Sequence, residues 1–339
     1  MTYTSGQLIQ ATDYNGFVGP TSSGGTANAN LNDFWGTGAT DKGWGQTALA
    51  NPAATDTITA TQWSGLVNNL ASAGSQTSTV LTSRTAPIAG GTIGILSALN
   101  TDLTSVTTNR GNAAASGTTS STWTGAIAKT AATGSGAAAW TITWTQTVTF
   151  GSAAQARYFW NAGGLVTLDM SFTNTTTPAD NDADWQRIVG YMGKLSMAGR
   201  VNSAAQTIAA VNYTGFTRGG TGGTQTTLAS TTGWYTLVAG AGATTMIQIN
   251  DATYLYTTNN IKVTAAVDAG STILTLVTTW TAPAKTGWGQ TNNITGGTTT
   301  GSPFTAFGTA PAVLCRFVPP STTNLSNSWG TPAVASSVV

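Results

Sequence analysis

The sequence predicts a mainly β protein: an antiparallel β-sandwich domain with an inserted short helix, preceded by a small α-helical N-terminal unit. Only 7% of the 339 residues are charged and Glu is absent, so the residues that usually cover helix surfaces are scarce. Threonine, valine, isoleucine and aromatic residues favour strands, while glycine, asparagine and serine favour turns. Residues 140–150 alternate strictly between large side chains and threonine, which is the period of a half-buried strand.

Residues 1–83 are predicted to form the small helical unit. Its three helical segments share a capping residue, apolar residues at helical spacing and a glycine near the end. They are Thr12–Val18, Asn30–Trp35 and a longer helix that opens at Thr61 and ends near Gly74. Residues 84–118 are a connector with one helix, from Ile95 or Leu96 to Thr108, whose apolar face is expected to pack on the helical unit.

Residues 119–320 are predicted to form the β domain. Besides residues 140–150, its strands are short runs of β-branched and aromatic residues between Gly-rich turns. These runs are Ile208–Val211, Trp234–Val238, Met246–Asn250, Tyr254–Tyr256, Ile261–Val267, Ile273–Trp280 and Val313–Val318. The turn Asp268–Ser271 predicts a hairpin. Residues 321–339, polar apart from Trp329, are expected to form a C-terminal tail that lies on another surface or frays.

Within the β domain, the sequence pattern is clearest over residues 155–192. Gln155–Trp160 is predicted to be an aromatic strand, and Asn161–Gly164 a tight hairpin turn, because asparagine and glycine adopt positive φ at low cost. Leu165–Phe172 alternates as a second strand. Trp185–Met192 carries apolar residues at i, i+3, i+4 and i+7, which predicts a short helix that covers the sheet.

The composition argues against several function classes. A net charge of +1 gives no field for nucleic acid or an anionic membrane, and no apolar run reaches the length of a membrane helix. Without histidine there is no imidazole base and no histidine metal ligand. The one cysteine, Cys315, is expected to be a small core residue. A neutral, hydroxyl-rich surface avoids repulsion between packed copies, which favours a protein that works in an assembly.

A repeated pentapeptide supplies the candidate contact residues. Gly43–Thr47 and Gly287–Thr291 both read Gly-Trp-Gly-Gln-Thr. Two interpretations stay open: loops pinned to the protein by a tryptophan, or exposed aromatic tips that stack on sugar rings or dock a neighbouring subunit. The candidate interface or ligand-contact residues are Trp44, Gln46, Trp288, Gln290 and, in the tail, Trp329.

Alternating acids mark the only candidate metal site. Asp180, Asp182 and Asp184 resemble the start of a calcium loop, but the glycine and the bidentate glutamate of such loops do not follow. Acids directly before a helix also accept hydrogen bonds from its free N–H groups and suit its dipole. The helix interpretation is preferred, and no metal is predicted.

Several short motifs stand out along nearly the whole chain. The most specific is Ala156–Gly164, which reads Ala-Arg-Tyr-Phe-Trp-Asn-Ala-Gly-Gly. The others are Asp13–Asn15, Asp41–Gln46, Thr61–Trp63, Asn109–Arg110, Pro319–Thr323 and Ser328–Pro332. In this order they resemble virion structural proteins of tailed phages, especially phages of cyanobacteria; an extra loop between Phe17 and Leu31 departs from that pattern. The resemblance implies a particle component without catalytic residues.

The predicted function is that of a non-enzymatic virion protein of a phage tail or fibre-like appendage. The chain is expected to form a homo-oligomer, a trimer, that attaches to other virion proteins through residues 1–83 and displays its β domain. The alternatives are a capsid decoration protein and a carbohydrate-binding adhesin that recognises host surface polysaccharide. No catalytic residue, cofactor, nucleic-acid partner or membrane insertion is predicted.

Overall fold

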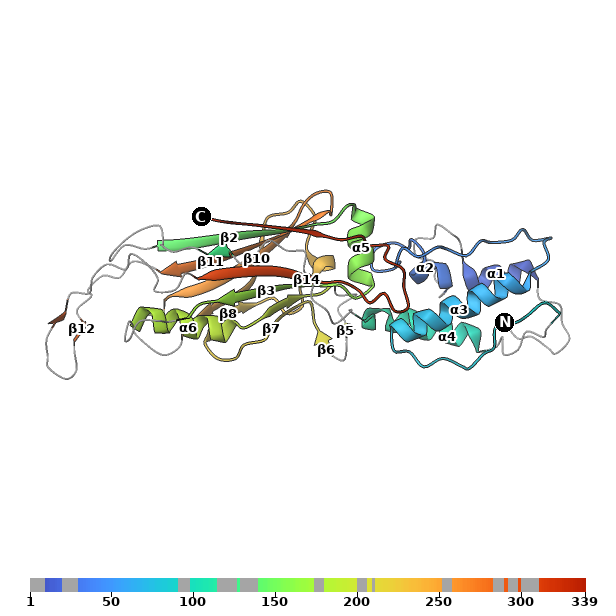
Figure 1. Ribbon diagram of the computed structural model, residues 1–339, viewed down its shortest axis with the longest axis horizontal. Coiled ribbons are helices and arrows are strands. Elements are labelled where there is room, and N and C mark those ends of the chain that lie inside the picture. Colours follow the sequence, from blue (N-terminus) through green and yellow to red (C-terminus); the bar gives the residue numbers. More distant parts are fainter. Residues whose placement is uncertain are drawn as a thin grey trace.

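The molecule is elongated, with the first four helices gathered at one end and the sheets at the other (Figure 1). The structure is a computed structural model. It describes residues 10–19, 30–90, 98–114, 127–128, 140–173, 180–199, 206–208, 211–251, 258–282, 290–291, 298–299 and 311–339. The mainly β architecture with antiparallel sheets that the sequence predicts is confirmed.

The helical end, which we call the helical unit, contains all the helices predicted for the first 118 residues. They are α1 (Ala11–Val18), α2 (Leu31–Trp35), α3 (Ala60–Gln76) and α4 (Leu99–Asn109), the last continued by the 3-10 turn η1 (Arg110–Asn112). A capping box begins α3, because the Thr59 hydroxyl accepts the Gln62 N–H while the Gln62 side chain accepts the Thr59 N–H. As expected, α4 packs against α1 and α3.

Two antiparallel sheets make up most of the other end. The five-stranded sheet runs, edge to edge, through β1 (Ile127–Ala128), β14 (Ala312–Val318), β3 (Leu165–Ser171), β4 (Leu195–Met197) and β7 (Phe216–Arg218). The six-stranded sheet runs through β15 (Ala333–Val338), β2 (Trp140–Thr149), β11 (Ile273–Ala282), β10 (Asn260–Val267), β9 (Thr244–Asn250) and β8 (Thr224–Leu228). Two short pairs are β5 (Gln206–Ile208) with β6 (Val211–Tyr213), and β12 (Gln290–Thr291) with β13 (Thr298–Thr299).

One hydrophobic core is built from both sheets and from the helical unit. The predicted inward face of β2 is confirmed, since every second side chain from Ile142 to Phe150 is buried. The helix α6 (Asp180–Met192) confirms the predicted covering helix and begins before it. Its Trp185 ring stacks on Trp280 of β11, with centroids 5.2 Å apart and ring planes 17° apart. The continuous core means that the two ends of the molecule pack together.

The predicted aromatic strand over Gln155–Trp160 is wrong, because these residues form the helix α5 (Ala153–Asn161). The Ser152 hydroxyl accepts the Gln155 N–H at 3.1 Å and so caps this helix. The predicted hairpin turn at Asn161–Gly164 is also wrong, because a helix and not a strand precedes it. Those residues instead lead from α5 into β3, with Gly163 at φ 102°.

Other strand predictions divide into three outcomes. The strands predicted over 246–250, 261–267, 273–280 and 313–318 are confirmed, as is the hairpin between β10 and β11. The strand predicted over Trp234–Val238 is wrong, since these residues contain the 3-10 turn η2 (Trp234–Thr236). The run Ile208–Val211 is divided between β5 and β6, and Tyr254–Tyr256 lies outside the described residues.

The C-terminal tail does not fray. Residues Ala333–Val338 form β15, which pairs with β2 and becomes the edge of the six-stranded sheet. Before it, Trp329 is 2% exposed and belongs to the core. The predicted tail is therefore neither frayed nor laid on a surface, because it supplies an edge strand and a core residue of the sheet end.

Candidate functional site

The first Gly-Trp-Gly-Gln-Thr repeat lies where the helical unit meets the sheets. It belongs to the loop 36–47, which follows α2 and reaches α5. Gly43 and Gly45 have φ of 91° and 67°, a backbone conformation that side-chain-bearing residues rarely adopt. A Cβ at Gly43 would collide with the backbone of Thr37, and one at Gly45 would collide with the Tyr158 ring of α5. Gly43 therefore allows the loop to fold back on itself, and Gly45 allows it to lie directly against α5. We call this loop and the side chains that it contacts the joint.

Trp44 is the apolar centre of the joint. Its side chain is 1% exposed and packs edge-on against Phe34 and Trp35 of α2, with centroids 5.6 and 6.4 Å away. Its indole Nε1 donates to the backbone oxygen of Asn161, at the end of α5, at 3.0 Å. The pinned-loop interpretation is thus confirmed for this repeat, and Trp44 as an exposed aromatic tip is wrong.

Gln46 fastens the same loop to the C-terminal segment. Its side-chain Nε2 donates to the Ser326 oxygen at 2.9 Å, while its Oε1 accepts the Ser326 N–H at 2.8 Å. The Ser328 hydroxyl donates to the backbone oxygen of Trp44. The structure therefore brings Trp44 and Gln46 together with the segment that carries Trp329, but as an internal contact and not as a surface for a ligand.

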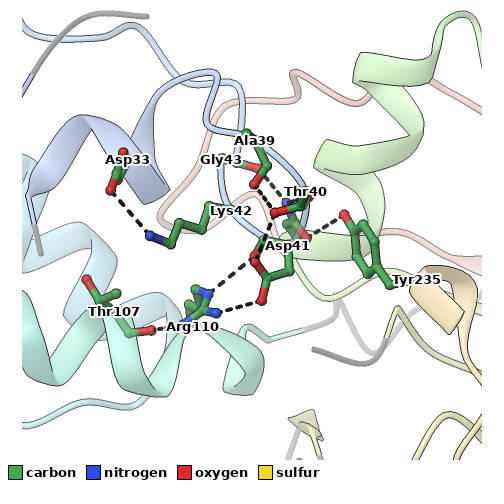
Figure 2. Close-up of polar contacts among 10 residues, drawn as sticks. Asp33, Ala39, Thr40, Asp41, Lys42, Gly43, Thr107, Arg110 and Tyr235 are labelled. Carbon is green, nitrogen blue, oxygen red and sulfur yellow. Dashed lines mark hydrogen bonds and ion pairs between the residues drawn. The ribbon is translucent and has the colours of Figure 1, made fainter. Parts of the chain in front are cut away.

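Asn161 is the polar centre of the joint. Its Nδ2 donates to the Gly43 oxygen at 3.1 Å and, more weakly, to the Thr40 oxygen at 3.4 Å. Its Oδ1 accepts the Tyr235 hydroxyl at 2.7 Å, and Tyr235 points toward the loop from η2 (Figure 2). Burial raises the pKa of Tyr235 well above its ordinary value, so the phenol remains a proton donor. One side chain thus links the loop to α5 and to the sheet end.

Ion pairs hold the loop to the helical unit (Figure 2). Arg110 of η1 contacts the Asp41 carboxylate at 2.6 Å, and both side chains are largely buried. Lys42 lies 3.4 Å from the buried carboxylate of Asp33 in α2. On the other side, the Arg157 guanidinium of α5 donates to the Thr37 oxygen at 2.9 Å. The loop is therefore fixed to elements of both ends of the molecule.

A second polar cluster lies under α6. The Arg187 guanidinium contacts Asp184 at 3.0 Å and Asp251 at 2.8 Å, and Asn259 donates to Asp184 at 3.1 Å. Burial, together with the neighbouring Asp251, raises the pKa of Asp184 from 3.8 to about 7. Both carboxylates are inaccessible to solvent, so the cluster anchors α6 and offers no open site for a substrate.

The calcium interpretation of the alternating acids gains no support. The preferred interpretation places the acids directly before a helix, but α6 begins at Asp180 and contains all three. Asp184 is used in the ion-pair cluster. Within the residues that the structure describes, no group of three or more His, Cys, Asp or Glu side chains could hold a metal ion. In that same part of the chain, no helix combines the length and the apolarity needed to cross a membrane.

The second repeat cannot be placed in the same way. Trp288 lies outside the described residues, and Gln290 is described only as part of the backbone pairing between β12 and β13. Sequence reasoning missed Asn161 and Tyr235 as contact residues. Asn161 is in the most specific motif, but its partners are more than 70 positions away, and no local pattern identifies them.

Comparison of the chain with protein-family models, curated proteins and solved structures finds no match. Four of the seven short motifs that stand out in the sequence meet in one place. Asp41–Gln46, Arg110, Asn161 and Ser328 all contribute contacts to the joint. The joint between the helical unit and the sheets is therefore the candidate functional feature of this protein.

Proposed function

We propose that this chain is a non-enzymatic structural component of a phage particle, in a tail or fibre-like appendage. The helical unit attaches it to other virion proteins, and the sheet end is displayed as a β-sandwich. The observation that carries this proposal is the joint, which holds the two ends of an elongated molecule in one orientation (Figure 1).

A projecting component must keep its displayed end in a fixed direction relative to its attachment. A flexible linker would allow the two ends to swing, since contacts between domains are ordinarily small and polar. Here the connection contains a buried tryptophan, a buried amide and a partly buried ion pair. These contacts support a rigid spacer rather than two independent modules.

The sandwich part of the proposal is supported by the shared core. Residues of both sheets, such as Val166 of β3 and Trp280 of β11, belong to the same cluster of buried side chains. Sheets that share a core in this way commonly pack face to face, about 10 Å apart. The copies of the chain form a homo-oligomer, which the low overall charge favours.

Cryo-electron microscopy of the particle that carries this chain tests the proposal. We expect density for the chain on the tail or an appendage, with α1 to α4 against a neighbouring virion protein and the sheets facing outward. Hundreds of copies over the capsid lattice would instead indicate a decoration protein. Absence of the chain from purified particles by mass spectrometry would refute a structural role.

A further inference from the structure

The outward face of the six-stranded sheet is almost without charge. Side chains alternate along each strand, so every second residue points away from the core and lines up with its neighbours across the sheet. The middle row runs from β15 to β9 through Ser337, Thr145, Val277, Thr264 and Thr245. Across these five strands the described outward residues are partly or fully exposed, and Lys262 is the one charged residue among them. We call this surface the threonine face.

Removing water from the threonine face costs little. Three threonines of β2 lie directly opposite threonines of β11, in the pairs Thr141–Thr281, Thr143–Thr279 and Thr147–Thr275. Directly opposed side chains of neighbouring strands are close enough for threonine hydroxyls to hydrogen-bond to each other. A hydroxyl that turns to its cross-strand partner keeps a hydrogen bond when water leaves, whereas an unpaired buried hydroxyl would be unfavourable. The threonine methyl groups then remain as apolar contact surface.

The composition of the face limits what can bind it. Nucleic acid requires a positively charged surface, and Lys262 alone does not provide one. Sugar rings and unstacked bases are typically held by aromatic side chains, and none occurs among the described outward residues of these strands. A neutral polypeptide surface with the same hydroxyl and methyl groups fits. A second copy of the chain provides it, with one lysine on each copy as the charge among the described outward residues.

The size of the face approaches that of a standard contact. Strands about 4.8 Å apart and roughly eight residues long give the five strands of the face an area of roughly 600 Å². A standard protein interface buries about 800 Å² on each partner. Val339 enlarges the face at its edge, since its backbone pairs with Thr143 and its side chain is 72% exposed. Twisted sheets also pack on one another in a defined way, at about −30°.

We infer that a second copy of this chain packs on the threonine face, sheet against sheet. The inference rests on the proposed assembly of the chain with itself and names the surface that it uses. A face that packs on its own copy relates the two chains by a two-fold axis. The contact therefore gives a dimer, or an assembly of even order, in place of the trimer expected from the sequence.

Sedimentation velocity of the full chain at micromolar concentrations tests the inference. The wild type should have about twice the 34.3 kDa mass of the chain. Val277→Lys places two like charges near the centre of the contact and should weaken dimerisation by about tenfold or more. Thr145→Lys, on the neighbouring strand of the same row, should act alike. The matched control is Val80→Lys, because Val80 follows α3, lies away from the threonine face and is 94% exposed. This variant should leave the dimer unchanged.

Melting curves of the variants verify that they are folded. A wild-type monomer would overturn both this contact and the proposed self-assembly. A trimer, or a dimer that neither lysine on the face weakens, would overturn the threonine face and leave the proposed particle component standing. Loss of the dimer in the two face variants alone, with unchanged melting, would establish the contact.

Discussion

Replacing Asn161 by alanine should loosen the joint. The variant leaves the Gly43 oxygen without the Asn161 amide and leaves the buried Tyr235 hydroxyl with only its weaker 3.4 Å contact to the Arg157 oxygen. A buried polar group that loses its partner costs about 1–3 kcal/mol. Two such groups, one of them partly compensated, predict that the free energy of unfolding falls by about 3 kcal/mol.

Urea unfolding followed by tryptophan fluorescence and by circular dichroism measures this loss. The matched control is Asn68→Ala on the exposed surface of α3, which should change the stability by no more than about 0.5 kcal/mol. A double-mutant cycle between Asn161→Ala and Tyr235→Phe isolates their hydrogen bond and should give a coupling of about 1 kcal/mol. A loss below about 1 kcal/mol for Asn161→Ala, without coupling to Tyr235, would refute the view of Asn161 as the centre of the joint.

Three further predictions concern the sheet end. The pKa of Asp184 is raised to about 7, so the native state holds this proton more tightly than the unfolded state does. The free energy of unfolding should therefore fall as pH rises from about 4 to 7. Urea titrations of Asp184→Asn should show a flatter dependence on pH over that range. Trp185→Ala removes the ring stacked on Trp280 and should lower the stability by about 3–5 kcal/mol, so unchanged melting would contradict its place in the core. Burial raises the pKa of Cys315 to about 12, so its thiol should resist a thiol reagent at pH 8 until the protein is unfolded.

The local sequence pattern predicts an element correctly where that element buries one regular face. The strands β2, β10 and β11 and the helices α3 and α6 follow from their periodicity, because a sheet or helix with one apolar face has one way to bury it. The helix α5 was missed because its aromatic residues favour strands when read one at a time. Yet Ala156, Phe159 and Trp160 are spaced at i, i+3 and i+4 after the capping Ser152, which is a helical signal.

The joint could not be derived from the sequence, for a different physical reason. The GWGQ motif was recognised, but its two interpretations differ only in what covers the tryptophan. The tryptophan is covered by α2, by Asn161 and by the segment around Ser328. The residues of the motif itself do not identify these distant partners. The pairing of β15 with β2 is hidden for the same reason, since a short run of valine, alanine and serine does not identify its partner.

The contacts of Gln46 also bear on the stage of folding at which the joint closes. Gln46 and Ser326 are 280 positions apart, so their bonds close nearly the whole chain into a loop. Closing a loop of that length costs about 5 kcal/mol of chain entropy if nothing between is ordered, and far less once the sheets have folded. We therefore expect the joint to close after the sheets have formed, because closure then costs less chain entropy. Until it closes, the helical unit has no fixed direction relative to the sheets, so alignment of the two ends should be a late event in folding.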